Sequence, residues 1–254
     1  MIRAALFDYG DTLVVPRARD RKVTSGAVQA CYSALARAGL GMPFEEFADV
    51  DESLHRQYAR MEAEEDRDIP DTVKYRELVG TLFPDRSEVW RRRAASRAKN
   101  AFWSVIVENY VPEDGLRRTL SRLKSMGLKM AVLSNHHNHQ ALVGHLRQLD
   151  LDQYFARVFS SDHLGVRKPN PEAFRRCLAA LGVEGGEAIF VGDSMVKDVG
   201  GARACGMRTV LVLREPWEKD DPLARAKVPA ADFEVQGVSE VPRIVRLLNG
   251  GKTT

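Results

Sequence analysis

The sequence predicts an α/β fold, in which a doubly wound parallel sheet carries a second, smaller domain made of helices alone. Residues 4–7 form an apolar run that leads straight into an acidic cluster, which is typical of a strand buried on both faces. From residue 112 onward, apolar runs of strand length alternate with helical patterns, as in a parallel sheet with right-handed crossovers. Residues 15–111 carry helical periodicity and almost no strand signal.

The chain has 254 residues, which is enough for one large domain or two moderate ones. We expect an α/β core formed by residues 1–14 and 112–254. A helical cap, or lid, is expected from residues 15–111, inserted directly after the acidic cluster. The two connections between these parts lie near residues 15–16 and 111–112, where hinges are expected.

Four helices are expected in the cap, each bounded by glycines, prolines or Asp-rich turns that interrupt the helical pattern. They are expected at residues 24–38, from residue 44 to a break at 68–71, around residues 75–82, and at residues 87–107.

The expected core is a series of strand and helix pairs. After the first strand, strands are expected at residues 129–133, 156–160, 187–191, 208–213 and 233–235. Helices are expected at residues 114–126, from beyond residue 135 to about 149, and at residues 172–181, 196–205 and 238–248.

Composition indicates an ordinary soluble globular protein, with 44% hydrophobic and 29% charged residues and a net charge of +3. This charge mildly favours anionic ligands but does not reach a nucleic-acid signature, so we expect no nucleic-acid partner. No apolar run approaches the ~20 residues of a membrane span, and the opening run ends at Asp8. Cys31, Cys177 and Cys205 are far apart and odd in number, which indicates packing residues in a cytoplasmic protein.

Two polar runs allow more than one interpretation. Residues 91–93 are three arginines, followed by Arg97 and Lys99. They favour a solvated helix face, with nucleic-acid contact or a grip on a substrate's distal anion as alternatives. The run at 136–139 contains three histidines. Adjacent histidines do not share one helix face, although His136 and His139 could. A pocket-lining role for His136 or His137 is therefore favoured over a metal site.

Polar side chains follow three of the expected strands at the point where each strand ends. Asp8 follows the first strand, Ser134 and Asn135 follow the second, and Asp193 follows a later one. The carboxyl ends of parallel strands meet at one edge of the sheet, where ligands bind. Lys168 lies in a loop between the strand that ends before Ser134 and the strand that ends before Asp193. A carboxylate in this place can act as a nucleophile, a metal ligand or both.

With these residues in view, the sequence resembles the haloacid dehalogenase superfamily, most of whose members are magnesium-dependent phosphatases. The family's motifs occur in the family's order, and the strand–helix frame around them covers residues 1–14 and 112–248. The helical block resembles the family's lid, inserted between the first and second motifs, on a Rossmann-like core. The four matching stretches are Phe7-Asp8-Tyr9-Gly10-Asp11-Thr12-Leu13, Leu133-Ser134-Asn135, Arg167-Lys168-Pro169-Asn170-Pro171 and Gly192-Asp193-Ser194-Met195-Val196-Lys197-Asp198.

The acidic residues suit a magnesium site. A divalent cation between Asp8 and a phosphate removes the repulsion between the two anions and polarises the phosphoryl group. Asp8 and Asp193 can supply carboxylate oxygens, which Mg²⁺ prefers. The resemblance implies that the backbone carbonyl of Gly10 is a further ligand. Asp198, with Ser194 beside it, would support the site by holding a metal-bound water or orienting the lysine.

The remaining motif residues suit a phosphoryl group. Ser134 offers a hydroxyl and Asn135 offers amide donors for the phosphoryl oxygens. Lys168 supplies positive charge near both Asp8 and the phosphate. Attack by Asp8 would give an aspartyl-phosphate that water then hydrolyses. Thr12 is a further candidate for phosphate binding. It either bonds back into the acidic loop and shapes it or is an ordinary turn residue.

The sequence departs from the family pattern at one position. Family phosphatases commonly carry a second Asp two residues after the nucleophile, where it acts as general acid and base. That position is Gly10 here, and Asp11 follows it. Asp11 either takes over the proton transfer in a shifted geometry or stabilises the turn.

These observations favour a Mg²⁺-dependent phosphatase that acts on a small phosphorylated metabolite through Asp8, as a monomer or homodimer without a membrane partner. One alternative is a 2-haloacid dehalogenase, which would use Asp8 without a metal. Asp193, Asp198 and Ser194 argue against it, and the missing second Asp leaves it open. Two further alternatives are a non-catalytic binding protein on the same scaffold and a phosphoacceptor switch, which would not need a lid.

Overall fold

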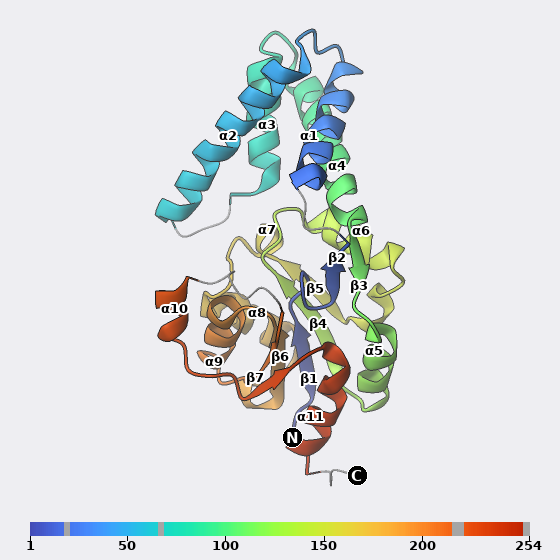
Figure 1. Cartoon of the computed structure of the whole chain (residues 1–254), viewed down its shortest axis with the longest axis vertical. Helices are drawn as coiled ribbons and strands as arrows, with labels where there is room; N and C mark the ends of the chain where they lie inside the picture. Colours follow the sequence, from blue (N-terminus) through green and yellow to red (C-terminus); the bar gives the residue numbers. More distant parts are fainter. Residues whose placement is uncertain (18–20, 66–68, 215–220, 251–254) are drawn as a thin grey trace. The chain divides into compact units, whose positions relative to one another are not determined.

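The computed structural model describes residues 1–17, 21–65, 69–214 and 221–250. Six parallel strands form one sheet in the order β5-β4-β1-β6-β7-β8 (Figure 1). Helices flank the sheet, so the predicted α/β class is confirmed. The strands are β1 (Ala4–Phe7), β4 (Lys129–Ser134), β5 (Arg157–Ser160), β6 (Ala188–Gly192), β7 (Arg208–Val212) and β8 (Phe233–Val235).

The central strand β1 lies where the direction of winding reverses. The chain moves from β1 outward through β4 to β5, then returns to the other side of β1 for β6, β7 and β8. All four residues of β1 are buried, which explains why the strand is apolar throughout. In doubly wound sheets, the reversal point opens a crevice at the carboxyl ends of the strands.

Helices and short helical turns connect these strands. The longer helices are α5 (Leu116–Ser125), α6 (His139–Gln148), α8 (Pro171–Leu181) and α11 (Val241–Leu248). The shorter ones are α7 (Ser161–Leu164), α9 (Gly201–Arg203) and α10 (Pro222–Ala226). Helical turns cover Asp152–Tyr154, Gly185–Glu187 and Val238–Glu240.

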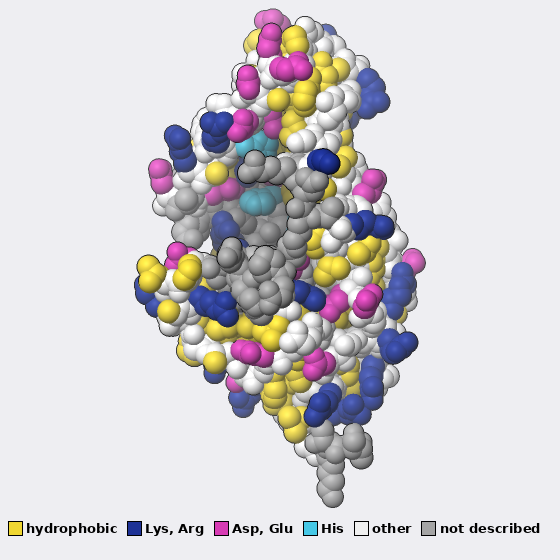
Figure 2. Space-filling view, in the orientation of Figure 1, with side chains coloured by type: hydrophobic (Ala, Val, Ile, Leu, Met, Phe, Trp, Pro, Cys, Tyr) yellow, Lys and Arg dark blue, Asp and Glu magenta, His cyan; other side chains and the backbone are white. Residues whose placement is uncertain are grey.

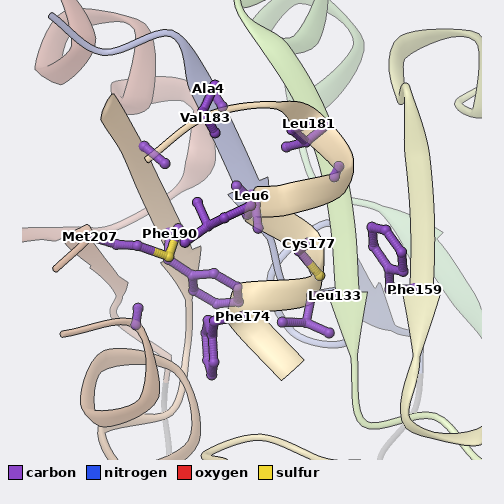
Figure 3. Packing of buried hydrophobic residues seen from close by; sticks show 14 of the residues in the cluster. Ala4, Leu6, Leu133, Phe159, Phe174, Cys177, Leu181, Val183, Phe190 and Met207 are labelled. Atoms are coloured by element: carbon purple, nitrogen blue, oxygen red, sulfur yellow. The ribbon is translucent and has the colours of Figure 1, made fainter. Parts of the chain in front are cut away.

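One hydrophobic core lies between the sheet and α8. Leu6 and Phe190 of the sheet face Phe174 and Cys177 of α8 (Figure 3). The rings of Phe174 and Phe190 meet edge to face, with centroids 5.1 Å apart. Cys177 is fully buried in this cluster, as expected for a packing residue.

Four longer helices form a second compact unit with a core of its own: α1 (Arg21–Ala36), α2 (Phe44–Glu65), α3 (Asp71–Leu82) and α4 (Glu88–Glu108). Leu35, Phe47 and Leu78 are buried in that core. Ala94 and Ala98 are buried on α4, where small side chains allow the neighbouring helices to approach closely.

The chain divides into one unit of residues 1–15, 111–135 and 146–254 and a second of residues 16–110 and 136–145. The predicted domain limits stay a prediction, and they differ from this division at residues 136–145. This segment was expected in the core but groups with the helical unit. His136 packs on the ring of Trp103, with centroids 4.5 Å apart.

Several elements differ from the sequence-based expectation. α1 begins at Arg21, so Thr24 and Ser25 lie inside the helix instead of capping it. The expected hinges form β2 (Val14–Pro16) and β3 (Tyr110–Pro112), which pair in a separate two-stranded sheet. Strands this short, each ending in proline, carry no readable alternation.

The expected helix at residues 196–205 is split. A π-helical segment, Met195–Gly200, precedes the short α9. Ser194 caps the segment by accepting a hydrogen bond from the N–H of Lys197. Residue 68, the first residue of the expected break at 68–71, belongs to residues 66–68, which lie outside the described part of the chain.

Surface charge is mixed. Basic, acidic and neutral side chains alternate over the face shown in Figure 2. Within the described residues, every helix is too short or too polar to traverse a bilayer.

Candidate active site

The sheet register brings the polar strand ends together. Phe7 pairs with Val132 of β4 and with Val191 of β6. Asp8 therefore lies one residue beyond the central strand, and its N–H donates to the carbonyl of Val191 at 2.9 Å. Ser134, the last residue of β4, lies at the same edge of the sheet.

Three carboxylates meet at this edge. Oxygens of Asp8, Asp193 and Asp198 lie within 4.8 Å of one another. The Nζ of Lys168 donates to Oδ1 of Asp8 and to Oδ1 of Asp198, both at 2.7 Å. The cluster thus holds three carboxylates against one ammonium group, and this excess of negative charge favours a bound cation.

Burial shapes the protonation of this cluster. Burial raises the pKa of Asp198, and Lys168 opposes part of that rise. For Lys168, burial works against the charged form, but the carboxylates of Asp198 and Asp8 outweigh it. The pKa of Lys168 consequently lies above its usual value, so the ammonium group stays charged.

Gly192 determines how Asp198 reaches the cluster. A Cβ at Gly192 would lie 2.3 Å from Oδ2 of Asp198, so only glycine leaves room for that carboxylate. The same Oδ2 accepts a hydrogen bond from the N–H of Ser194 at 2.9 Å. The signal for this contact was in the quoted motif, where glycine precedes Asp193, but its reason is visible only in three dimensions.

The side chain of Asn135 hydrogen-bonds the backbone of Lys168, a contact that the sequence did not indicate. Its Oδ1 accepts from the backbone N–H of Lys168 at 2.8 Å, and its Nδ2 donates to the carbonyl of Lys168 at 2.9 Å. The prediction assigned the Asn135 amide donors to phosphoryl oxygens. In the structure the side chain clamps the backbone of Lys168 and so positions the ammonium group, and the assignment to phosphoryl oxygens stays a prediction.

The acidic loop after β1 is held mainly through its backbone. Asp11 adopts φ of 58°, in the left-handed region that Asp tolerates better than most residues. Its N–H donates to the carbonyl of Val14 at 2.7 Å, and its carbonyl accepts from Nε of Arg214 at 2.7 Å. These contacts support the turn role of Asp11. Thr12 is buried, and its hydroxyl donates to Oδ1 of Asp193 at 3.4 Å.

Sequence reasoning missed Arg214. Besides Asp11, its guanidinium contacts the carboxylate of Glu113 at 2.6 Å. Burial raises the pKa of Glu113, and Arg214 acts against that rise. Glu113 also donates through its N–H to the carbonyl of Leu13 at 3.0 Å. This pair fixes the acidic loop from both sides, and nothing in the local sequence marks it.

Among the described residues, the histidine run is not part of a group with metal-ligand spacing. Nδ1 of His136 accepts from the N–H of Asn138 at 3.1 Å, and His137 lies 3.8 Å from Glu62. In the part of the chain that the structure describes, the Asp cluster is the single group of three or more His, Cys, Asp or Glu residues with metal-ligand spacing.

Comparison with known proteins identifies the family. A model of the haloacid dehalogenase-like hydrolases matches residues 2–206. The chain belongs to the haloacid dehalogenase-like hydrolase family. This family membership confirms the resemblance drawn from the four motifs.

The relatives within the haloacid dehalogenase-like hydrolases carry different names. The chain is 28% identical to a glyceraldehyde 3-phosphate phosphatase of Methanopyrus kandleri, over 98% of this chain and 99% of the relative. Its fold resembles a 2-haloacid dehalogenase of Pseudomonas syringae pv. tomato, with a TM-score of 0.71, 23% identity and coverage of 97% and 99%. An L-2-haloacid dehalogenase of Xanthobacter autotrophicus gives a TM-score of 0.57, 26% identity and the same coverage.

Proposed function

We propose that the protein is a phosphatase that hydrolyses a small phosphorylated metabolite through an aspartyl-phosphate on Asp8. The observation that carries the proposal is the cluster of three carboxylates held against a single buried lysine. The relative from Methanopyrus kandleri supports it, because that protein is named a phosphatase and matches nearly the whole chain. Its name also makes glyceraldehyde 3-phosphate the first substrate to test.

The donor set fits Mg²⁺, because carboxylate oxygens are the hard ligands that this cation prefers. Asp8 and Asp193, with the Gly10 carbonyl, would hold the ion. Bound there, Mg²⁺ offsets the negative charge facing a phosphate and polarises the phosphoryl group. Both oxygens of Asp198 already accept hydrogen bonds, from Lys168 and from Ser194. Asp198 therefore orients the lysine.

The side chains then divide the work of phosphoryl transfer. Asp8 attacks phosphorus, and the bond from phosphorus to the leaving alcohol oxygen breaks. Lys168 holds Asp8 in place and neutralises part of the charge that spreads over the phosphoryl oxygens. The Ser134 hydroxyl binds those oxygens, while Asn135 keeps Lys168 in position. Water then attacks phosphorus and releases phosphate and the Asp8 carboxylate.

A direct test is hydrolysis of p-nitrophenyl phosphate and of glyceraldehyde 3-phosphate by the pure protein with Mg²⁺. We expect turnover that disappears in chelator and in Asp8→Asn. A circular dichroism spectrum equal to that of the wild type would show that the variant is folded. Turnover that continues in chelator contradicts the role given to the metal, and absence of turnover with every phosphoester favours a binding protein on the same scaffold.

A second candidate is a 2-haloacid dehalogenase. The fold likeness to dehalogenases and the glycine at position 10 favour it. The two reactions differ in which atom water attacks. A single turnover in H₂¹⁸O places the label in phosphate if an aspartyl-phosphate forms. It places the label in the Asp8 carboxylate if an ester to carbon forms. Halide release from 2-chloropropionate in chelator, with labelled Asp8, would replace the phosphatase proposal.

A further inference from the structure

The helices α3 and α4 of the helical unit line a cavity of about 230 Å³. Thr72 and Arg76 of α3 lie four residues apart, and Arg92, Ser96 and Lys99 of α4 are spaced by four and three. These spacings place each set on one face of its helix. Gln140, from the segment that groups with the helical unit, completes this part of the lining.

The cavity is strongly cationic. Arg76, Arg92 and Lys99 line it, and none of the described lining residues is Asp or Glu. The carboxylate of Glu88 lies 3.5 Å from Arg92, but both side chains are more than half exposed, so solvent screens this pair. The lining therefore presents positive charge without a matching carboxylate.

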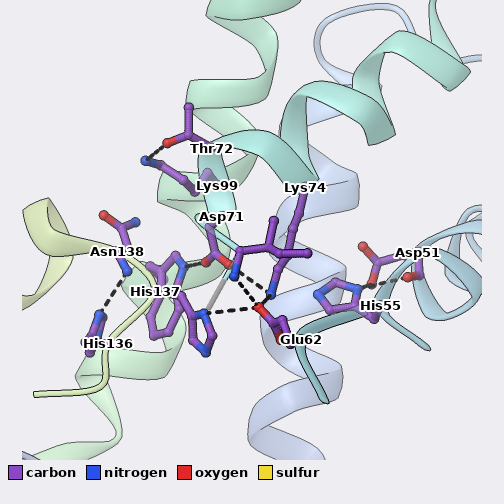
Figure 4. Close-up of polar contacts among 12 residues, drawn as sticks. Asp51, His55, Glu62, Asp71, Thr72, Lys74, Lys99, His136, His137 and Asn138 are labelled. Atoms are coloured by element: carbon purple, nitrogen blue, oxygen red, sulfur yellow. Dashed lines mark hydrogen bonds and ion pairs between the residues drawn. The ribbon is translucent and has the colours of Figure 1, made fainter. Parts of the chain in front are cut away.

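Lys99 is the most informative member of this set. It is only 9% exposed, and its Nζ donates to the hydroxyl of Thr72 at 3.2 Å (Figure 4). Across the described ranges, no carboxylate lies within 4 Å of this ammonium group. A buried ammonium without a counter-charge is costly unless something else neutralises it.

Lys74 shows what a completed site looks like in the same unit. It is also 9% exposed, but its Nζ lies 2.9 Å from Glu62 and 3.9 Å from Asp71 (Figure 4). The two lysines have equal burial and opposite pairing. Lys99 is thus a buried cation without a neighbouring carboxylate, and the cavity beside it offers space for an anion.

The size and chemistry of the cavity suit a small anionic group. Its volume is below the roughly 300–1,000 Å³ of sites for drug-sized ligands. Guanidinium groups bind phosphate and carboxylate through paired N–H donors, and an ammonium group adds a point charge. Arg76 and Arg92 are exposed and Lys99 is buried, so an anion would pass the arginines and end at the lysine.

We propose that this cavity binds the phosphate or carboxylate group of a small metabolite, with Lys99 at its inner end. The site lies wholly in the helical unit and does not depend on the reaction assigned to Asp8. The proposed site also assigns different roles to the basic residues at 91–99 of α4. Arg92 and Lys99 face the cavity, whereas Arg91, Arg93 and Arg97 do not line it.

The test is isothermal titration of the full chain with inorganic phosphate and, separately, with malonate, at constant ionic strength in chelator. Without a metal, the Asp cluster is net negative and does not attract the anion. We expect Lys99→Met to weaken binding at least about tenfold, because truncation leaves the anion without its buried partner. Arg97→Met removes the same charge from an exposed position outside the cavity and should bind as the wild type does.

The two anions separate the two sources. Tighter binding of phosphate would assign the site to a phosphorylated ligand, and tighter binding of malonate would assign it to an organic acid. The proposal is overturned if neither anion binds, or if Lys99→Met and Arg97→Met weaken binding equally, which would indicate unspecific charge attraction.

Thermal unfolding in chloride buffer gives an independent readout. Lys99→Met removes an unpaired buried charge, so its Tm should equal or exceed that of the wild type. Lys74→Met removes the cation 2.9 Å from the half-buried Glu62 carboxylate, so its Tm should fall. If Lys99→Met destabilised the protein as much as Lys74→Met, Lys99 would be paired in solution and the site would be refuted. Arg92→Met provides a second cavity variant for the titration.

Discussion

Gly10 occupies the position of the family's usual second Asp, and the structure shows that a side chain is sterically possible there. A Cβ built at Gly10 meets no atom within 4 Å. Its φ is not in the left-handed region, in contrast to Asp11 at 58°. The absence of the acid is therefore a chemical property of this chain and is not imposed by crowding.

We predict that Gly10→Asp increases turnover of alkyl phosphates far more than that of p-nitrophenyl phosphate. A general acid helps a poor leaving group most, and such help is worth about 10²-fold or more. The measurement is kcat for both substrates with Mg²⁺. An equal change for both would show that the new carboxylate does not protonate the leaving oxygen.

Gly192 should tolerate no side chain. Gly192→Ala would drive a Cβ into the Asp198 carboxylate at 2.3 Å and displace the partner of Lys168. We expect at least about a hundredfold loss of kcat/KM, as for other displacements of positioning groups. Gly186→Ala, just before β6, is the matched control, because the same added methyl group meets open space outside the Asp cluster and should cost little activity. Full activity of Gly192→Ala would contradict the assigned position of Asp198.

His136 makes the stability depend on pH. Burial, with a smaller contribution from His137, lowers the pKa of His136 to about 3. The unfolded chain takes up this proton near pH 6.5, whereas the folded chain does not, so stability falls as pH drops below that value. Between pH 7.5 and pH 5 we expect a loss of about 2 kcal/mol from this group.

Urea unfolding at both pH values, for the wild type and His136→Phe, isolates this contribution. The phenyl ring keeps the contact with Trp103 and cannot titrate, so the variant should lose less stability on acidification. His163→Phe, in the other unit, serves as the control. A variant with the pH dependence of the wild type would mean that His136 is protonated in the folded protein.

At the scale of elements, the contact between α8 and α9 supports the loop that contains Lys168 and Pro169. A Cβ at Gly201 would lie 2.3 Å from the ring of Phe174 and 2.8 Å from the carbonyl of Pro169, the residue after Lys168. α9 therefore packs closely on α8 only because position 201 has no side chain.

We predict that Gly201→Ala lowers stability by about 1–3 kcal/mol, as overpacking usually does, and lowers kcat because the loop with Lys168 moves. Gly200→Ala is its neighbour control, since the nearest atoms to its Cβ would be at 3.4 Å or more. Chemical unfolding and steady-state kinetics of the two variants provide the measurement. Equal behaviour of the two would show that the α8–α9 contact can relax.

The sequence was most informative about elements that are defined by their own residues. The apolar runs before Asp8, Ser134 and Asp193 predicted β1, β4 and β6, and their shared edge followed from parallel pairing. The clamp of Asn135 on Lys168 and the bond from Arg214 to Asp11 escaped prediction. They join residues 33 and 203 positions apart, and no local pattern encodes such contacts.

At the scale of the whole molecule, the two units have separate hydrophobic cores and the candidate Mg²⁺ ligands belong to one of them. A ligand stabilises the part that binds it, by about 2.7 kcal/mol at 100 times its Kd. We therefore expect Mg²⁺ to raise the unfolding temperature of the α/β unit and to leave that of the helical unit nearly unchanged.

The chain has three tryptophans, and Trp90 and Trp103 lie in the helical unit. If the third is removed by Trp217→Phe, tryptophan fluorescence reports the unfolding of the helical unit alone, while circular dichroism reports the unfolding of both units. The Mg²⁺-dependent shift should appear in the second signal and vanish in Asp193→Asn. Equal shifts in both signals would show that the two units unfold as one.

Because Asn135 positions Lys168, we expect deamidation of Asn135 to limit how long the protein stays active. Deamidation of Asn135 would convert the donor Nδ2 into a second carboxylate oxygen, placed against the carbonyl oxygen of Lys168. One hydrogen bond would become a repulsion, and the ammonium group would no longer be held at its hydrogen bond to Asp8. An ageing sample should then lose turnover in step with the mass gain of the peptide that contains Asn135, well before the fold itself is damaged.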